Sequence, residues 1–375
     1  MKLDWATPPD DAALRQLLRE TPVPGQITLS FEREPNYFAA AAIESDECDE
    51  CDECDDERAH RVLLARDEHN ALMGCASHSS RLRYVNGVAT RVGYFSQLRA
   101  QQDLGGMAHA RFIRNGFARF KQCLCDSDPA FSLMSLIAGN SAAQRLLTHG
   151  LPGFPHTKRM GALHTYTLNT RRARPALAAA GLQPGTPQHA DEILHCLRRN
   201  LTRHQFAPVW QFDGRHAAHT PEWKDFWIVT HGSHVLGCVA LWDQRAFKQS
   251  VVRGYAPGLA RWRRLINTLG RFVNLPYLPA VGCGLDVAYL SPIAIDNDDP
   301  DVFATLLRAA LNAASQRGIT HVVIGLCAGH KLESVVRRYR HINYASEIFA
   351  VYWDSGAADV AQIDTRPMAP DIATL

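Results

Sequence analysis

The sequence predicts a mixed α/β fold built as two tandem copies, each a central, mostly antiparallel sheet flanked by helices. The first observation is length, because 375 residues suit two ordinary domains and 46% hydrophobic residues can fill two cores. The second is order: strand hairpins followed by a strand, a helix, a strand and a short helix occur twice. The expected division is a domain over 1–170, a linker over 171–188 and a domain over 189–375.

The first copy is expected to begin with antiparallel strands. Residues 27–35 alternate apolar and polar side chains, as a half-buried strand does. A polar turn at 67–70 and the two-residue turn Asn86-Gly87 each indicate a hairpin. The expected elements are, in chain order, a strand over 27–35, a helix through 37–43, strands over 62–66, 72–77 and 92–99, a helix over 112–124, a strand over 131–138 and a short helix over 140–147.

The second copy follows a proline-containing segment over 171–188, which has the composition of a linker. A hairpin is expected at 231–234, because apolar runs flank this polar turn. The expected elements are, in chain order, a helix over 191–201, strands over 227–230, 235–241 and 285–295, a helix over 302–311, a strand over 322–326, a helix over 332–339 and a final strand over 348–353.

A Gly-rich turn over 102–110 joins the strand at 92–99 to the helix that follows it. With few side chains at the start of a helix, consecutive backbone N–H groups can point at an anion such as a pyrophosphate. A Gly-Gly pair alone more often marks a simple turn. Here the ordered strand, turn, helix and second strand around Gly105 and Gly106 favour a cofactor site.

In this region the chain resembles the GNAT superfamily of N-acyltransferases. That family carries Gln/Arg-x-x-Gly-x-Gly/Ala after the first strand and Asn-x-x-Ala after the second. Gly105 stands at the Gln/Arg position, Ala108 at the first Gly and Ala110 at the Gly/Ala position, whereas Asn140 and Ala143 match. The resemblance implies an acyl-CoA site in the first copy, with weaker binding of the phosphates because the basic side chain is absent.

The resemblance also implies acetyl-CoA as the cosubstrate and suggests how it is held. Backbone N–H groups where the strand splays would polarise the thioester carbonyl, and Asn140 would contact the pantetheine arm. His109, when protonated, can supply part of the charge absent at Gly105, or it can be a solvated surface histidine. The expected cofactor-binding residues are Leu98, Arg99, Ala100, Gly105, Gly106, Met107, Ala108, His109, Ala110 and Asn140.

Acyl transfer from a thioester to an amine also needs a proton for the departing thiolate. The tyrosine that supplies it in the family falls here at Leu147. Tyr94, His149 and Cys125 are the substitutes that the sequence offers, and a CoA thiolate can also leave into water without an acid. Among these side chains, Tyr94 is the candidate catalytic residue.

The amine must be deprotonated, and Glu32 and Glu34 are the candidate bases at the end of the first strand. In GNAT proteins this region faces the acceptor cleft. A buried carboxylate there can have its pKa raised toward neutrality. The alternative is a surface ion pair with Arg33.

The second copy departs from the family where its strand at 285–295 ends. Residues 296–301 hold four aspartates where a pyrophosphate would dock, and their negative charge opposes an anion. An acidic N-cap with Pro300 in the first turn instead stabilises the next helix, by about 0.3–1 kcal/mol per charge through its dipole. This copy is expected to bind no CoA and to be degenerate.

An acidic loop over 45–58 contains Cys48, Cys51 and Cys54 at every third position. These thiolates and His60 can make up a tetrahedral zinc site in principle. Zinc sites usually join separated pairs of ligands, whereas these thiols lie in one run of carboxylates, which favours an extended, solvated insertion. No metal is expected. Buried free thiols are expected in the core strands at Cys75, Cys238 and Cys327.

Residues 259–273 predict an amphipathic helix whose charges are all basic. Its apolar side chains share one face, and Arg261, Arg264 and Arg271 lie largely on others. A basic amphipathic helix can lie on an anionic membrane. More often such a helix packs on its own sheet or on a neighbouring domain, with its arginines in water. The sequence leaves both interpretations open.

Composition limits the classes of partner. A net charge of +2 provides no global attraction to nucleic acid, so no nucleic-acid partner is expected. The first residues lack the apolar stretch of a secretory signal, and no apolar segment is long enough to cross a bilayer. These features predict a cytoplasmic protein without a transmembrane segment.

The leading hypothesis is an acetyl-CoA-dependent N-acyltransferase that acts on a small-molecule or peptide amine. The alternative is a non-catalytic tandem scaffold that senses a ligand or binds a protein, which the altered glycine loop and Leu147 favour. A third hypothesis is a tandem enzyme that takes amino acids from aminoacyl-tRNA, for which Arg198, Arg199 and Arg203 begin a basic groove. The acceptor and the oligomeric state cannot be read from the sequence.

Overall fold

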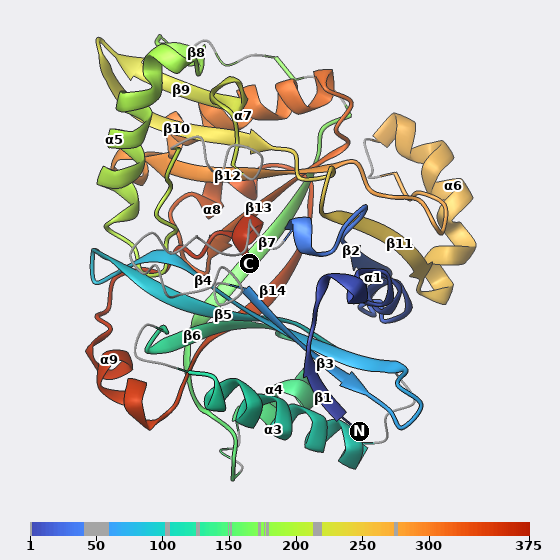
Figure 1. Cartoon of the computed structure of the whole chain (residues 1–375). Helices are drawn as coiled ribbons and strands as arrows, with labels where there is room; N and C mark the ends of the chain where they lie inside the picture. The colour runs from blue at the N-terminus through green and yellow to red at the C-terminus, as the bar shows by residue number, and fades with distance from the viewer. Residues whose placement is uncertain are drawn as a thin grey trace.

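The structure, a computed structural model, describes residues 2–40, 60–101, 106–124, 128–148, 150, 152–171, 174–175, 177, 180–212, 220–273 and 277–375. Its elements repeat one plan (Figure 1). In the first half they are β1 (Lys2–Trp5), α1 (Asp11–Glu20), β2 (Ile27–Glu32), β3 (His60–Arg66), β4 (Leu72–Val85), β5 (Val88–Ala100), α3 (Gly106–Gln122), β6 (Phe131–Ile137), α4 (Ser141–Thr148) and β7 (His156–Asn169). In the second half they are β8 (Leu182–Pro184), α5 (Ala190–Leu201), β9 (Phe226–His231), β10 (His234–Trp242), β11 (Gln249–Tyr255), α6 (Pro257–Val273), β12 (Val287–Ile295), α7 (Pro300–Gln316), β13 (His321–Cys327), α8 (Glu333–Val336), β14 (His341–Tyr352) and α9 (Ala357–Gln362).

One twelve-stranded sheet runs through both halves, in the order β1-β3-β4-β5-β6-β14-β7-β13-β12-β10-β9-β8. Its ladders are antiparallel except for β5 with β6 and β12 with β13. The order is symmetric about its centre: β1, β3, β4, β5 and β6 of the first half correspond to β8, β9, β10, β12 and β13 of the second. The expected mixed, mostly antiparallel fold in two tandem copies is confirmed.

The two central strands are exchanged between the halves. The last strand of the first half, β7, pairs with β13 from His321 to Cys327. The last strand of the second half, β14, pairs with β6 from Ser346 to Tyr352. Because β7 and β14 also pair with each other, each half receives its closing strand from the other half. The two copies therefore share one continuous sheet.

Helices cover both faces of each half-sheet. On β3, Leu63 packs under α3 while its neighbour Leu64 packs against α1, as the alternation of side chains along a strand requires. The second half repeats this pattern, with Val239 of β10 in the core under α7 and Cys238 in the core under α5. Each half consequently has two apolar layers, one on either side of the sheet.

The face of α3 that covers the sheet is the aromatic face that the sequence predicts. Phe112, Ile113, Phe117 and Phe120 are all buried. Burial of one such side chain contributes about 1.5–3 kcal/mol. Leu124 was expected on the same face but follows the end of the helix and is half-buried. The three core thiols expected at Cys75, Cys238 and Cys327 are free and buried.

Two insertions meet in a second, two-stranded sheet, in which β2 of the first half pairs with β11 of the second. The strand expected at 27–35 is thus present over Ile27–Glu32, but it lies outside the main sheet. Two other expectations differ in extent. Part of the segment interpreted as a linker forms β8, which pairs with β9. The final strand, β14, starts at His341 rather than at 348.

Among the described residues, no helix combines the length and hydropathy needed to cross a membrane. The acidic loop with Cys48, Cys51 and Cys54 lies outside the described residues.

Candidate active site

The first-half sheet opens between β5 and β6. The two strands pair only where Gly93–Phe95 faces Ser132–Met134. Beyond Phe95, β5 stays with β4 and β6 stays with β14, so the strands separate. Gln97 has a φ of 49°, in the left-handed region, and the register of β4 with β5 shifts at this point. The splay expected near Leu98 to Ala100 therefore begins just after Phe95.

The second half has the same opening between β12 and β13. These strands pair only where Val287–Tyr289 faces His321–Val323. Beyond that, β12 follows β10 and β13 follows β7. The chain thus carries two equivalent openings between strands, one in each half.

The second-half cleft is filled by the end of the chain, residues 369–372. Ile372 lies against β13 at Gly325, where a Cβ would come within 2.7 Å of the Ile372 Cβ. The remaining cavity measures about 60 Å³ and is lined by β12, β13, the end of α5 and residues 369–372. Ligand sites for small molecules are typically several hundred Å³. This cavity has room for a few water molecules and not for a pantetheine arm.

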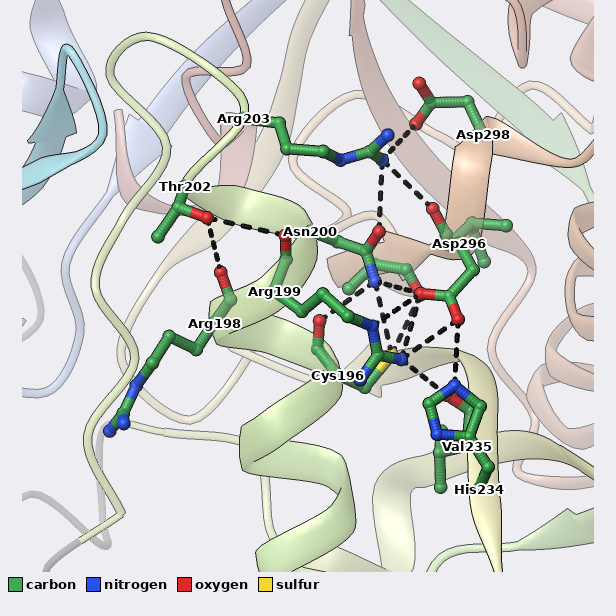
Figure 2. Close-up of polar contacts among 12 residues, drawn as sticks. Cys196, Arg198, Arg199, Asn200, Thr202, Arg203, His234, Val235, Asp296 and Asp298 are labelled. Carbon is green, nitrogen blue, oxygen red and sulfur yellow. Dashed lines mark hydrogen bonds and ion pairs between the residues drawn. The ribbon is translucent and has the colours of Figure 1, made fainter. Parts of the chain in front are cut away.

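The acidic turn after β12 is neutralised by α5, as Figure 2 shows. Asp296 accepts two hydrogen bonds from Arg199, each of 3.0 Å, and one of 2.8 Å from the Asn200 side chain. His234 lies 3.2 Å from the same carboxylate. Burial opposes the charge of Asp296, but the hydrogen bonds from Asn200 and Arg199 outweigh it and lower its pKa. A carboxylate therefore occupies this basic site.

The N-terminus of α7 is also occupied by the chain itself. The Asp299 side chain accepts hydrogen bonds from the backbone N–H groups of Asp301 at 2.8 Å and Val302 at 3.3 Å, and Pro300 opens the helix. The expected acidic N-cap is confirmed. These are N–H groups that an anion at this helix end would need.

His204, Asp298 and His330 bring three potential ligand atoms within 4.8 Å of one another beside the small cavity. Burial lowers the pKa of both histidines, so they are neutral near pH 7. The backbone N–H of Leu332 donates to His330 Nδ1 at 3.2 Å, which places the ring proton on Nε2, the nitrogen that faces Asp298. Asp298 also pairs with Arg203 at 3.3 Å. His204 Nδ1 donates to the backbone carbonyl oxygen of Asn200 at 3.1 Å, so each of the three side chains also has a partner within the protein.

In the first half, the helix α3 begins inside the segment 102–110 that the sequence predicted to be a Gly-rich turn. Gly106, Met107, Ala108, His109 and Ala110 form the first turn of α3, and Gly105 lies outside the described residues. The Asn140 side-chain oxygen accepts a hydrogen bond from the backbone N–H of Ala143 at 3.1 Å, so Asn140 caps α4. The two family positions that the sequence retains thus meet at the start of one helix.

The last residues of β5 differ in their surroundings. Leu98 is exposed, whereas Arg99 is half-buried opposite Cys75 of β4. Burial lowers the pKa of the Arg99 guanidinium. Electrostatic interaction with Cys75 and Tyr37 partly offsets this effect of burial on the Arg99 pKa. The Arg99 side chain therefore belongs to the β4–β5 layer, and its contribution at the splay would come from the backbone.

The candidate bases are both paired with arginines. Glu32 is buried and accepts hydrogen bonds from Ser30 and from Arg253 of β11. Glu34 pairs with Arg15 at 2.6 Å and with Arg19, both on α1. An arginine would have to move away before either carboxylate could accept a proton from an amine.

The candidate acid positions are buried. Tyr94 is 8% exposed and packs with Val92 and Leu133 of its own half. Leu147, at the position of the family tyrosine, is 3% exposed and belongs to the core under α3. His149 and Cys125 lie outside the described residues.

A buried carboxylate that the sequence analysis missed orients a histidine in the second half. Glu333 of α8 accepts hydrogen bonds from His164 Nδ1 at 2.6 Å and from the Tyr166 hydroxyl at 2.7 Å, both on β7. Burial opposes its charge, but these bonds outweigh it and lower the pKa of Glu333. The bond at Nδ1 leaves His164 Nε2 as the nitrogen with a free lone pair. A glutamate among the apolar residues 332–336 was the only sequence signal of this cluster.

The topology and the paired splayed strands define a protein with two tandem copies of the GNAT fold. No protein-family model matches the sequence, and no curated protein matches it. The solved structures do match. A GCN5-related N-acetyltransferase from Sphaerobacter thermophilus is 12% identical over 100% of this chain and 98% of its own, with a TM-score of 0.56.

The N-myristoyltransferase of Saccharomyces cerevisiae with bound myristoyl-CoA is 11% identical, over 93% of this chain and 82% of its own, with a TM-score of 0.58. A second structure of that enzyme with myristoyl-CoA is 10% identical, over 93% of this chain and 78% of its own, with a TM-score of 0.55. Identities this low show a shared fold and leave the activity of this chain to be argued from its site.

Proposed function

We propose that the protein is an N-acyltransferase that uses a CoA thioester, with its active site at the splay between β5 and β6 in the first half. The observation that carries this proposal is the difference between the two equivalent clefts. The second is filled by Ile372, and Asp299 caps the helix at its mouth. In the first, the splay is joined to a helix that opens with Gly106 and to the cap residue Asn140.

Each part of the first-half site supplies one function in this proposal. The N-terminal turn of α3 offers backbone N–H groups to the pyrophosphate. Backbone N–H groups of β5 from Leu98 to Ala100 stabilise the developing oxyanion, because they no longer pair with β6. Asn140 contacts the pantetheine arm. Tyr94, on the same strand as Leu98, is the proposed acid for the departing thiolate. Glu32 and Glu34 act as base only when their arginines are displaced.

Acetyl-CoA is the donor we propose first, and the acceptor is a small-molecule or peptide amine. The similar solved structures are named as an N-acetyltransferase and as an N-myristoyltransferase with bound myristoyl-CoA. The acyl chain is therefore the variable to test. Shape and polarity of the acceptor cleft would set the amine.

The experiment is calorimetric titration of the full chain with acetyl-CoA, myristoyl-CoA and free CoA. One site of micromolar affinity is expected. The Gly106→Asp variant places a carboxylate at the start of α3 and should abolish binding by repelling the phosphates. Gly284→Asp is the matched control, because a Cβ there meets no other atom within 4 Å and the added charge is the same.

Binding should be followed by thiol release in the presence of amines. If binding survives Gly106→Asp, the anion loop is not at α3. If none of the three ligands binds or shifts the melting temperature, the acyltransferase proposal is wrong.

Failure of all three ligands to bind would favour the other candidate function, a non-catalytic scaffold that binds a ligand or a protein. Two observations favour it already. The position of the family acid is a core residue, Leu147, and the candidate bases Glu32 and Glu34 are held in ion pairs. A protein that binds none of the three ligands, or that binds CoA and releases no thiol with any amine, would match this description.

A further inference from the structure

The half-buried side of the amphipathic helix α6 carries Leu259, Arg263, Ile266 and Asn267, and the two polar residues among them bind the following segment. Arg263 donates hydrogen bonds to the backbone carbonyl oxygens of Leu278 at 3.2 Å and Pro279 at 2.9 Å. The Asn267 side chain both donates to Leu278 O at 2.9 Å and accepts from Leu278 N at 2.8 Å. These polar contacts fix the rotation of the helix, so only part of its apolar face lies on the half-buried side.

This orientation leaves the other part of the apolar face of α6 exposed. Trp262, Leu265 and Leu269 are 52%, 47% and 51% exposed. Their spacing of three and four residues places them on one stripe of the helix. Figure 1 shows α6 at the edge of the molecule, beside the two-stranded sheet of β2 and β11. Three large apolar side chains in one exposed stripe indicate an interaction surface.

The charged residues of α6 itself are of one sign. Arg261 and Arg264 are exposed, and residues 257–273 contain no aspartate or glutamate. In the segment that α6 holds by hydrogen bonds, Tyr277 and Val281 are also exposed, and the Arg171 guanidinium lies 4.3 Å from the Tyr277 ring centroid. Trp and Tyr with an apolar body and a polar tip, flanked by arginines, are the composition of surfaces that lie at a membrane interface.

We propose that α6 is a membrane-docking helix that binds anionic lipid surfaces, with Trp262, Leu265 and Leu269 inserted among the acyl chains. Arg261 and Arg264 contact the lipid phosphates. Charge complementarity selects this occupant, because a second copy of the same helix would bring arginines of equal sign together. The helix lies on the membrane and does not cross it. The proposal does not depend on acyl transfer.

The test is flotation of the full chain with vesicles of phosphatidylcholine and phosphatidylserine, against vesicles of phosphatidylcholine alone. Binding is expected only to the anionic vesicles and should weaken with salt. Arg261→Gln combined with Arg264→Gln should reduce partitioning about thirtyfold, since each arginine near such a surface contributes about 1 kcal/mol. Leu265→Gln combined with Leu269→Gln should reduce it about tenfold or more.

Val88→Gln is the matched control, because Val88 is 65% exposed at the β4–β5 turn and its loss should leave flotation unchanged. A blue shift of tryptophan emission on vesicle addition should be absent in Trp262→Phe. Circular dichroism of each variant shows whether it is folded, so that a loss of flotation can be assigned to loss of binding.

Absence of flotation at low salt would overturn the proposal, and so would flotation that both double variants leave unchanged. A dimer in light scattering that Leu265→Gln with Leu269→Gln converts to a monomer would also overturn it, because the stripe would then be an interface between copies of this chain.

Discussion

A side-chain hydrogen bond between β4 and β6 passes directly over Gly93 of β5, the strand that lies between them. His78 of β4 and Ser132 of β6 flank β5, and His78 Nε2 lies 2.9 Å from Ser132 Oγ. A Cβ at position 93 would stand 2.2 Å from Ser132 Oγ and 2.5 Å from His78 Nε2. We therefore expect Gly93→Ala to break this bond and to destabilise the first-half sheet next to the splay.

The cost has two parts. Contacts this short force the side chains or strands apart, and such overpacking typically costs about 1–3 kcal/mol. A buried histidine and a buried serine then lose their partner, and each unsatisfied group costs about 1–3 kcal/mol. With one contribution from overpacking and one from each unsatisfied group, the expected loss in the free energy of unfolding is about 3–9 kcal/mol. Gly93 does not have a positive φ, so the effect arises from packing rather than from backbone strain.

Urea unfolding at neutral pH measures this loss, as a shift of the midpoint at constant slope. Gly139→Ala is the control, because a Cβ there meets no other atom within 4 Å. Ser132→Ala removes the nearest clashing atom, so Gly93→Ala should cost at least about 1 kcal/mol less in that background. Two results would refute this account of the bond. One is a loss below about 0.5 kcal/mol in the wild-type background, and the other is that the effects of Gly93→Ala and Ser132→Ala simply add in the double variant.

Two further predictions concern acid stability and the shared sheet. Burial lowers the pKa of His78 and of His321 from 6.5 to about 4. Above pH 6.5 neither histidine affects stability; as the pH falls from 6.5 to 4 the unfolded chain binds protons first, so stability should fall by about 1 kcal/mol per pH unit for each histidine. Urea titrations in this window should show a slope that is smaller by about 1 kcal/mol per pH unit in His321→Gln than in the wild type. Residues 1–170 alone lack β14, the partner of β6, and should show no cooperative unfolding transition by circular dichroism, whereas the full chain should.

Local patterns in the sequence predicted most elements of each half. Asn86-Gly87 marks a hairpin that the structure contains, and the aromatic spacing of 112–120 marks the buried face of α3. Local patterns do not specify which strands pair over long distances. The exchange of β7 and β14 joins residues about 200 apart, for example Ala162 with Glu347, and no turn or period in the sequence encodes it.

The candidate site has the same limit. The order of strand, helix, strand and short helix is local, and the structure contains these elements in that order, with the strands separating after Phe95. The expected contact of Asn140 with a pantetheine arm stays a prediction. The partners of Glu32 and Glu34 come from α1 and from β11. Arg253 lies more than two hundred residues from Glu32, and only the pairing of β2 with β11 brings them together. A carboxylate's protonation depends on such partners, so its role as base could not be read from its own position.

The segment from β14 to Ile372 contacts both halves of the protein. From Ser346 to Tyr352, β14 closes the sheet beside the first-half cleft. The chain then turns through α9 and returns, so that Ile372 fills the cleft of the second half and Asp371 accepts a hydrogen bond of 2.6 Å from Ser291 of β12. The second cleft is therefore occupied by the continuation of the strand that completes the first half. Occupation of the second cleft by residues 369–372 and closure of the sheet in the first half have a common structural cause, and the apolar contacts of these residues would be lost if a ligand took their place.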